Sequence, residues 1–144
     1  MSRIDGLHPK VKELASSLIL KAGEAGHHIV ITQGLRTNEE QAALYAQGRI
    51  APGKIVTNAK PGQSFHNFGV AFDIALVKAD KGISWDTKMD VDDNHVPDFT
   101  DVGLIGESLG LEWGGRFNSI VDLPHFQFTG GLTLKDFQEG KKLV

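Results

Sequence analysis

The stretch SFHNFGVAFDIAL, residues 64–76, decides the fold that this sequence predicts. From residue 70 to residue 77, large apolar side chains alternate with smaller ones, which is typical of a β-strand with one buried face. Asp73 falls on the face of small residues, and His66 lies just before the strand in a turn of Ser, Asn and Gly. A buried carboxylate without a partner is costly. His66 and Asp73 therefore need either a structural partner or a chemical role.

The elements on either side of this strand favour an α+β fold. The apolar periodicity and the positions of Pro and Gly predict helices over residues 9–25, 39–47 and about 100–109, and strands over 27–32, 70–77, 83–85 and 125–129. Thr37 and Glu40 have capping-box spacing at the start of the second helix. Residues 49–63 form a loop long enough to cover or build a site. This irregular order of helices and strands predicts a small antiparallel sheet flanked by helices.

Length and composition limit the possible function. The chain has 144 residues, 40% hydrophobic and 23% charged, so we expect one domain over residues 1–144, with residues 130–144 as an amphipathic tail packed on it. A net charge of −3 without a basic stripe argues against nucleic acid as a partner. No apolar run approaches the ~20 residues that cross a bilayer, so we expect no membrane insertion. Because the chain has no cysteine, a metal ion would need histidine and carboxylate ligands.

Four residues form a candidate metal site: His66, Asp73, Asp122 and His125. Two imidazoles and one carboxylate match the three protein ligands of a catalytic zinc ion, and the other carboxylate is then free to move protons. Each residue also has a structural interpretation. His66 would bond to backbone in a turn, Asp73 would pair with a nearby Arg or Lys, and Asp122 would be a turn or cap residue.

Five segments resemble a known family: QGLRT at 33–37, SFHNFGVAFD at 64–73, DLPH at 122–125, and, less directly, 44–64 and 109–117. The similarity runs in order along residues 7–129, and the family is the zinc D-Ala-D-Ala carboxypeptidase/dipeptidase family (peptidase family M15). Within that family the sequence resembles the L-alanyl-D-glutamate endopeptidase branch of phage endolysins and bacterial cell-wall hydrolases. The resemblance implies a fold of the Hedgehog/D-Ala-D-Ala peptidase type. It also implies one zinc ion per chain, bound by His66, Asp73 and His125.

The resemblance implies roles for four further residues. Asp122 would be the general base, at a position where many relatives carry glutamate, and Arg36 would stabilise the developing oxyanion. Ser64 and Gln33 would orient the substrate or the ligands. The segment LGLEWGGRF departs from the commoner Gly-Gly-Asp-Trp pattern at Arg116, to which we assign no role.

The function implied by the resemblance is hydrolysis of the L-Ala–D-Glu bond in peptidoglycan stem peptides. The alternatives are a D,D-carboxypeptidase or dipeptidase of the same fold, and a non-catalytic wall-binding module that holds zinc. We expect a monomer whose partner is the stem peptide. The N-terminus MSRIDGLHPK shows no secretory signal, so we expect synthesis in the cytoplasm and action on the cell wall after phage-mediated release or another export route.

The acidic segment DVDDNHVPDFTD, residues 90–101, is a candidate calcium loop. Its oxygen-bearing residues stand at positions 1, 3, 5, 9 and 12 of an EF-hand-like pattern, namely Asp90, Asp92, Asn94, Asp98 and Asp101. His95 replaces the glycine of the sharp turn. The alternative is a solvated acidic loop that leads into the next helix.

The remaining histidines and the tryptophans receive structural interpretations. We interpret His8, His27 and His28 as structural or surface residues. Trp85 and Trp113 are interpreted as core or groove-wall residues rather than stacking platforms, because nothing basic surrounds them.

Overall fold

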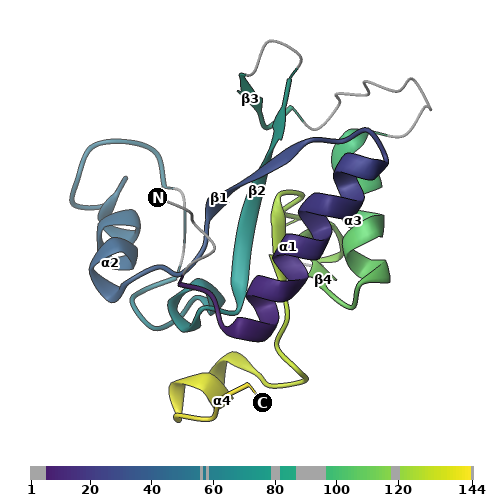
Figure 1. The fold of residues 1–144 in the computed structure, drawn as a ribbon. Coiled ribbons are helices and arrows are strands. Elements are labelled where there is room, and N and C mark those ends of the chain that lie inside the picture. The colour runs from purple at the N-terminus through teal and green to yellow at the C-terminus, as the bar shows by residue number, and fades with distance from the viewer. Residues whose placement is uncertain are drawn as a thin grey trace.

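The computed structural model describes residues 6–55, 57, 59–78, 82–86, 97–117 and 121–143, which Figure 1 shows as a sheet with helices around it. Within these residues the sheet contains β1 (Ile29–Gln33), β2 (Ala71–Val77), β3 (Ile83–Ser84), β4 (Glu112–Trp113) and β5 (His125–Gln127). The strand order is β1-β2-β5-β4, and β3 also pairs with β2. These pairings are antiparallel, which confirms the predicted α+β fold with a small antiparallel sheet.

Strand β2 is central and brings distant segments to one face. Asp73 lies opposite His125 on β5 and opposite Gln33 on β1. The register with β1 shifts between Ile31 and Gln33, and irregularities of this kind re-aim side chains beside functional sites. Because cross-strand partners project from the same face, Gln33, Asp73 and His125 gather on one side of the sheet.

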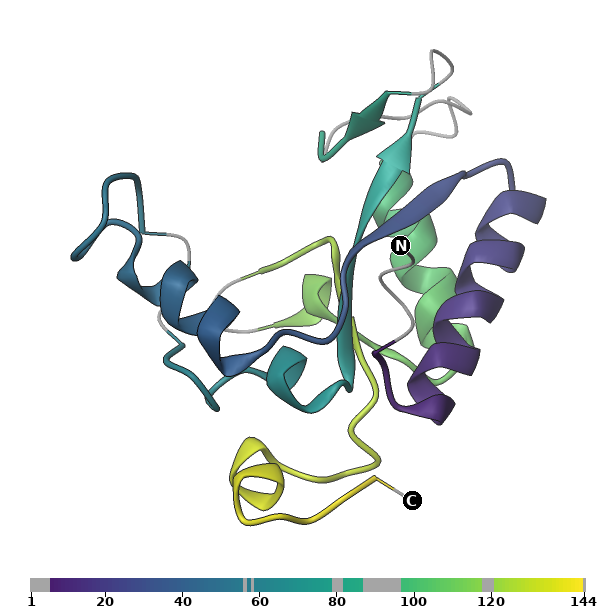
Figure 2. The ribbon, with the colours of Figure 1, turned by 60° about the vertical axis from the view of Figure 1, so that its left-hand side comes forward.

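The hydrophobic core lies on the other side of the sheet. Helices α1 (Pro9–Glu24) and α3 (Asp98–Ser108) cover that face, whereas α2 (Asn38–Ala46) lies on the opposite side (Figure 2). Helix α1 buries the apolar stripe Val11, Leu14, Ala15, Leu18 and Ala22. The fully buried rings of Phe72 and Phe126 stack with centroids 5.6 Å apart. The core thus fixes the positions of β2 and β5, whose other face carries Asp73 and His125.

The predicted elements are present, and their ends differ from the observed ones by one or two residues, which is within ordinary fraying. The capping box of α2 is formed as predicted: Glu40 N donates to Thr37 Oγ1 over 3.1 Å, and Thr37 N donates to Glu40 Oε1 over 3.0 Å. The sequence did not predict four short elements: strand β4, the 3₁₀-helical turns η1 (Phe65–Phe68) and η2 (Gly114–Arg116), and the short helix α4 (Leu134–Gln138).

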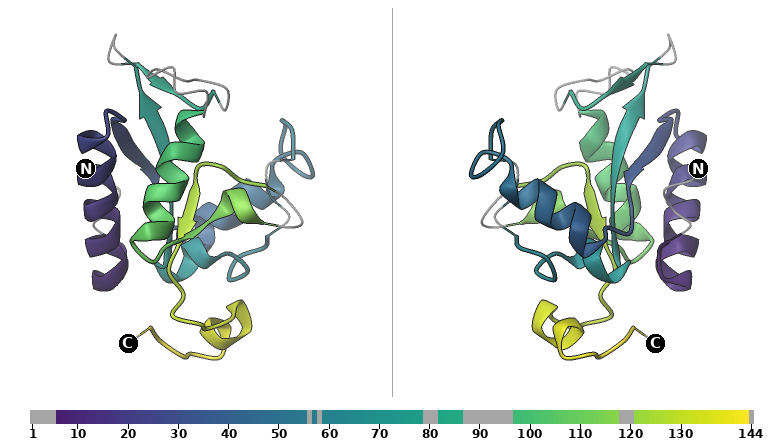
Figure 3. Two further views of the ribbon diagram at one scale, coloured as in Figure 1. Left: turned by 90° about the vertical axis from the view of Figure 1, so that its right-hand side faces the viewer. Right: turned by 90° about the vertical axis from the view of Figure 1, so that its left-hand side faces the viewer.

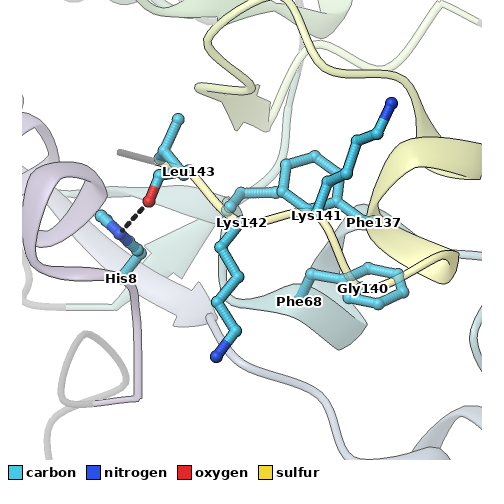
Figure 4. Close-up of a pocket in the computed structure, with 8 residues that line it drawn as sticks. His8, Phe68, Phe137, Gly140, Lys141, Lys142 and Leu143 are labelled. Carbon is cyan, nitrogen blue, oxygen red and sulfur yellow. Dashed lines mark hydrogen bonds between the residues drawn. The ribbon is translucent and has the colours of Figure 1, made fainter.

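The C-terminal tail packs against η1, and both views of Figure 3 show its helix α4, in yellow, at the bottom of the molecule. Buried Phe137 stacks on Phe68 at 5.5 Å between centroids. His8 accepts a hydrogen bond from Lys10 N at Nδ1, so its proton is on Nε2, which donates to the Leu143 carbonyl over 3.1 Å (Figure 4). A cavity of about 310 Å³ remains between the tail and η1. The single domain predicted for residues 1–144 stays a prediction.

His27 joins α3 to the start of the sheet, in keeping with a structural role. Its Nδ1 lies 3.5 Å from Asp98 Oδ1, and its Nε2 lies 3.2 Å from Asp101 Oδ2. The two ring nitrogens face different carboxylates, so the imidazole bridges Asp98 and Asp101. None of the helices in the described part of the chain is long and apolar enough to cross a membrane.

Candidate metal centre

The short turn η1 delivers His66 to the sheet. Ser64 is its N-cap: Ser64 Oγ accepts from His66 N over 3.2 Å, and Asn67 Oδ1 accepts from Ser64 N over 3.3 Å. Gly69 ends the turn with φ of 71°, a left-handed conformation that favours glycine. These bonds fix the backbone of His66 immediately before β2.

Three side chains converge where η1, β2 and β5 meet. Asp73 Oδ1 lies 3.4 Å from His66 Nε2 and 3.1 Å from His125 Nδ1. Three ligands about 2.0–2.1 Å from a tetrahedral zinc ion lie roughly 3.3 Å from one another. The nitrogen–oxygen separations therefore fit a shared zinc ion, and the donor set of two imidazoles and a carboxylate suits that metal.

Hydrogen bonds behind the two imidazoles orient them for such a role. His66 Nδ1 lies 3.0 Å from the Gly34 carbonyl, which can only accept, so Nδ1 carries the proton and Nε2 is left for a ligand. His125 Nε2 lies 2.8 Å from Gln127 Oε1, which leaves Nδ1 facing Asp73. Metal-binding histidines use their second ring nitrogen in this way.

The electrostatics of the centre favour an ionised carboxylate. Burial by itself would raise the pKa of Asp73, but hydrogen bonds and charge from His125 and His66 outweigh it and hold that pKa well below its usual range. Burial opposes the charged form of His125, and the hydrogen bond and charge of Asp73 nevertheless raise the pKa of the imidazole. The site is thus built for a positive charge next to Asp73.

Arg36 is held at both its backbone and its guanidinium. Arg36 N donates to the His66 carbonyl over 2.9 Å, and Asn67 Nδ2 donates to the Arg36 carbonyl over 2.9 Å. Arg36 Nη1 donates to Gln41 Oε1 over 2.9 Å, and fully buried Gln41 donates to the Ala59 carbonyl over 2.7 Å. Burial lowers the pKa of Arg36, against the charges of Asp73 and Glu40. The buried Nε of Arg36 has no hydrogen-bond partner among the described residues.

Asp122 lies in the loop before β5, and Gly114 permits its position. Asp122 N donates to the Gly114 carbonyl over 3.0 Å, and a Cβ on Gly114 would collide with the Asp122 carbonyl oxygen. Burial, followed by the negative charge of Asp73, raises the pKa of the Asp122 carboxyl. A carboxylate with a raised pKa is a stronger base and, once protonated, a usable acid near neutral pH.

One cavity of about 390 Å³ brings together every residue to which the sequence assigned a zinc, catalytic or substrate role. It is lined by His66, Asp73, His125, Asp122, Arg36, Ser64 and Gln33, together with Leu44 and Thr57. The sequence did not predict Leu44 or Thr57, nor the supporting roles of Gln41 and Gln127. Gln127 had a signal, since it shares a strand face with His125, but the burial of Gln41 depends on the loop that contains Ala59.

The comparisons with known proteins agree with this geometry. A model of the D-alanyl-D-alanine carboxypeptidase family in peptidase family M15 matches residues 57–128, half of the chain. The peptidoglycan L-alanyl-D-glutamate endopeptidase CwlK of Bacillus subtilis (strain 168) is 45% identical over 121 residues, which cover 84% of this chain and 72% of that protein. The chain belongs to peptidase family M15. The L-alanyl-D-glutamate peptidase of Listeria phage A118 is 28% identical over 89% of this chain and 40% of its own length.

Solved structures of M15 peptidases share the fold. The Serratia marcescens L-Ala D-Glu endopeptidase ChiX superposes with a TM-score of 0.61 at 21% identity, over 94% of this chain and 87% of that one. A vancomycin resistance D,D-pentapeptidase, VanY, in complex with Zn(II), has a TM-score of 0.57 at 15% identity, over 92% and 78% of the two chains. At these identities the likeness establishes the fold.

The calcium loop has no support in the M15 fold or in the described residues. Asp90, Asp92 and Asn94 lie outside the described residues. The carboxylates of Asp98 and Asp101 both contact His27 in the first turn of α3, which gives them a different partner. The calcium site therefore stays an untested expectation, and we do not pursue it.

Arg116, where the sequence departs from the commoner M15 pattern, is exposed and pairs with Glu107 of α3. Its Nε and Nη2 donate to the two carboxylate oxygens of Glu107 over 3.0 and 3.1 Å. Exposed pairs of this kind contribute little to stability.

Proposed function

We propose that this chain is a zinc-dependent peptidoglycan peptidase that hydrolyses the L-Ala–D-Glu bond of the stem peptide. The observation that carries the proposal is the convergence of His66 Nε2, Asp73 and His125 Nδ1 in a cavity that also contains Asp122 and Arg36. The bond specificity is supported by the two relatives named for that bond.

His66, Asp73 and His125 would hold the zinc ion. When bound, zinc supplies a Lewis acid that polarises the scissile carbonyl and makes water a better nucleophile. The carbonyl of Gly34 and the amide of Gln127 fix which ring nitrogen of each histidine faces the ion.

Asp122 would act as general base and then as general acid. Its carboxylate accepts a proton from the attacking water and returns it to the nitrogen of D-Glu as the C–N bond breaks. Burial raises the pKa of Asp122, which makes its carboxylate a stronger base than an exposed one.

Arg36 would stabilise the negative charge that develops on the carbonyl oxygen. A guanidinium that is already oriented does not need to reorganise during the reaction, and removing one such donor typically costs about 10²–10³ in kcat. Gln41 provides that orientation, and Arg36 lines the cavity in which the substrate would lie.

Ser64 and Gln33 would orient the substrate in the cavity. The Ser64 oxygen accepts from His66 N, so its hydroxyl proton is left to donate to a substrate oxygen. Gln33 offers an amide from the irregular end of β1.

A D,D-carboxypeptidase is the second candidate, because the matching family model carries that description. Mass spectrometry of peptidoglycan digested by the zinc-loaded protein separates the two. New D-Glu amino termini are the expected product, and release of terminal D-Ala alone would refute the endopeptidase. Neither new D-Glu amino termini nor released D-Ala would favour the third possibility, a wall-binding module without turnover.

The cell wall is the proposed site of action, by analogy with CwlK and the Listeria phage peptidase. Action as a monomer on the stem peptide stays a prediction.

A further inference from the structure

A second cavity adjoins the metal centre on the side of β3. It has a volume of about 520 Å³, within the range of ligand-binding pockets. It shares Gln33, Asp73 and Asp122 with the first cavity and continues past Pro124 to Ile83 and Trp85. The metal centre therefore lies between two spaces, and the proposed function uses only one of them.

The register of the sheet explains why Ile83 and Trp85 reach this cavity. Val77 on β2 lies opposite Ile83, and Val77 shares a strand face with Asp73. Ile83 and, two residues later, Trp85 thus stand on the same side of the sheet as the metal centre. Both are unusually open for large apolar residues: Trp85 is 51% exposed and Ile83 is 46% exposed. Trp113, by contrast, is buried, and its Nε1 donates to the Leu123 carbonyl.

The two cavities differ in charge. The first contains the Arg36 guanidinium and the hydroxyls of Thr57 and Ser64. The carboxylates of Asp73 and Asp122 line both cavities, and among the described residues that line the second there is no lysine or arginine. Because Arg36 lines only the first cavity, an anionic ligand group is favoured there over the second.

A peptidoglycan stem has the same asymmetry around the L-Ala–D-Glu bond. The D-Glu side carries carboxylates, whereas the L-Ala side leads through a neutral amide to the lactyl group and sugar ring of N-acetylmuramic acid. Charge complementarity places D-Glu beside Arg36, so the L-Ala side must leave through the second cavity. The exposed indole of Trp85 offers an apolar face on which a pyranose ring can stack, as an aromatic ring would.

We propose, resting on the proposed function, that Trp85 and Ile83 form a subsite for the muramic acid sugar that carries the L-Ala. In this role Trp85 is a stacking residue, in contrast to the groove-wall interpretation drawn from sequence. The subsite makes the enzyme prefer stems that are still attached to glycan over free peptides.

Two substrates and two variants test the subsite. The substrates are N-acetylmuramoyl-L-Ala-D-Glu and the sugar-free N-acetyl-L-Ala-D-Glu. Trp85→Ala should lower kcat/KM for the first about 3- to 10-fold, mainly through KM, and leave the second unchanged. Trp85→Phe should restore most of the loss. Leu20→Ala, an exposed apolar residue of α1 on the far side of the sheet, is the matched control and should alter neither substrate. Equal effects of Trp85→Ala on both substrates, or none on either, would overturn the subsite.

A binding measurement separates this proposal from the proposed function. The chain has two tryptophans, so their indole N–H signals in a ¹H–¹⁵N spectrum are assigned by Trp85→Phe. Titration with N-acetylmuramoyl-L-alanine should shift the Trp85 signal and leave that of buried Trp113 in place. If neither substrate is cleaved by the wild-type protein, the proposed function fails, and this titration still decides the subsite: an unmoved Trp85 signal refutes it.

Discussion

Replacing Gln41 by leucine should separate the position of Arg36 from its charge. Gln41 is fully buried and makes two hydrogen bonds: it accepts from Arg36 Nη1 over 2.9 Å and donates to the Ala59 carbonyl over 2.7 Å. Leucine has a similar volume and makes neither bond. Arg36 itself stays in place, because its backbone is bonded to His66 and Asn67.

The size of the effect follows from these contacts. A hydrogen bond with a charged partner contributes about 1.5–3 kcal/mol, and an unsatisfied buried carbonyl costs about 1–3 kcal/mol. Leucine offsets part of this through apolar contacts, which leaves a destabilisation of roughly 2–3 kcal/mol. For a chain of this length that corresponds to a fall in Tm of about 5–10 °C. Because complete loss of such a donor costs about 10²–10³ in kcat, loss of its orientation should cost roughly 10- to 30-fold.

The assay is hydrolysis of a muramoyl dipeptide by the zinc-loaded variant at a temperature where it is fully folded, with kcat and KM measured separately. Gln47→Leu is the control, because Gln47 Nε2 also donates to a backbone carbonyl, that of Lys54, without touching Arg36. The control should keep wild-type kcat. A folded Gln41→Leu protein with unchanged kcat would refute the inference that Gln41 orients a catalytic arginine.

Two further results are expected. Gly114→Ala should lower kcat about 100-fold, because the new Cβ displaces the Asp122 loop by a distance that matters for catalysis. Gly23→Ala on α1 is the control and should keep wild-type kcat, because its Cβ would meet only His28 Nδ1, at 3.9 Å, an ordinary contact. A wild-type kcat in Gly114→Ala would contradict this reasoning. In the metal-free protein, the Asp73–His125 pair should add most to the free energy of unfolding between about pH 4 and 6.5. The depressed pKa of Asp73 contributes stability above about pH 4, which is lost on acidification. The raised pKa of His125 contributes stability below about pH 6.5, which is lost as the pH rises through that pKa. Chemical unfolding of wild type and Asp73→Asn across this range measures the difference, and a constant difference would contradict it.

The local pattern of the sequence was sufficient for the fold around β2. Alternation over residues 70–77 predicted a half-buried strand, and the capping box of Thr37 and Glu40 predicted where α2 begins; both depend on interactions within a few residues. The face that Asp73 occupies followed from the same alternation. Its partners did not, because the register that sets Asp73 opposite His125 joins segments 52 residues apart.

The supporting residues of the site could not be predicted from the local sequence either, because their roles depend on contacts between distant segments. Gln41 reads as an ordinary helix residue, and only the fold of residues 49–63 over α2 makes it a buried bridge to Arg36. The sequence also does not show that Trp85, which directly follows β3, lies beside the metal centre. For the acidic segment 90–101, the ligand-like spacing predicts calcium, which stays a prediction, and the sequence does not show that Asp98 and Asp101 contact the imidazole of His27 from another part of the chain.

The central claim is that zinc is bound by His66, Asp73 and His125 and that Asp122 is the base. Its most direct test is to measure zinc stoichiometry and peptidoglycan hydrolysis on the same Asp122→Ala sample. We expect one zinc ion per chain, as in the wild type, with hydrolysis of the L-Ala–D-Glu bond lowered by at least about 100-fold. His66→Ala, prepared in parallel, should lose both zinc and activity. Full hydrolysis by the zinc-loaded Asp122→Ala protein would contradict the assignment of the base, and full zinc content in His66→Ala would contradict the metal centre.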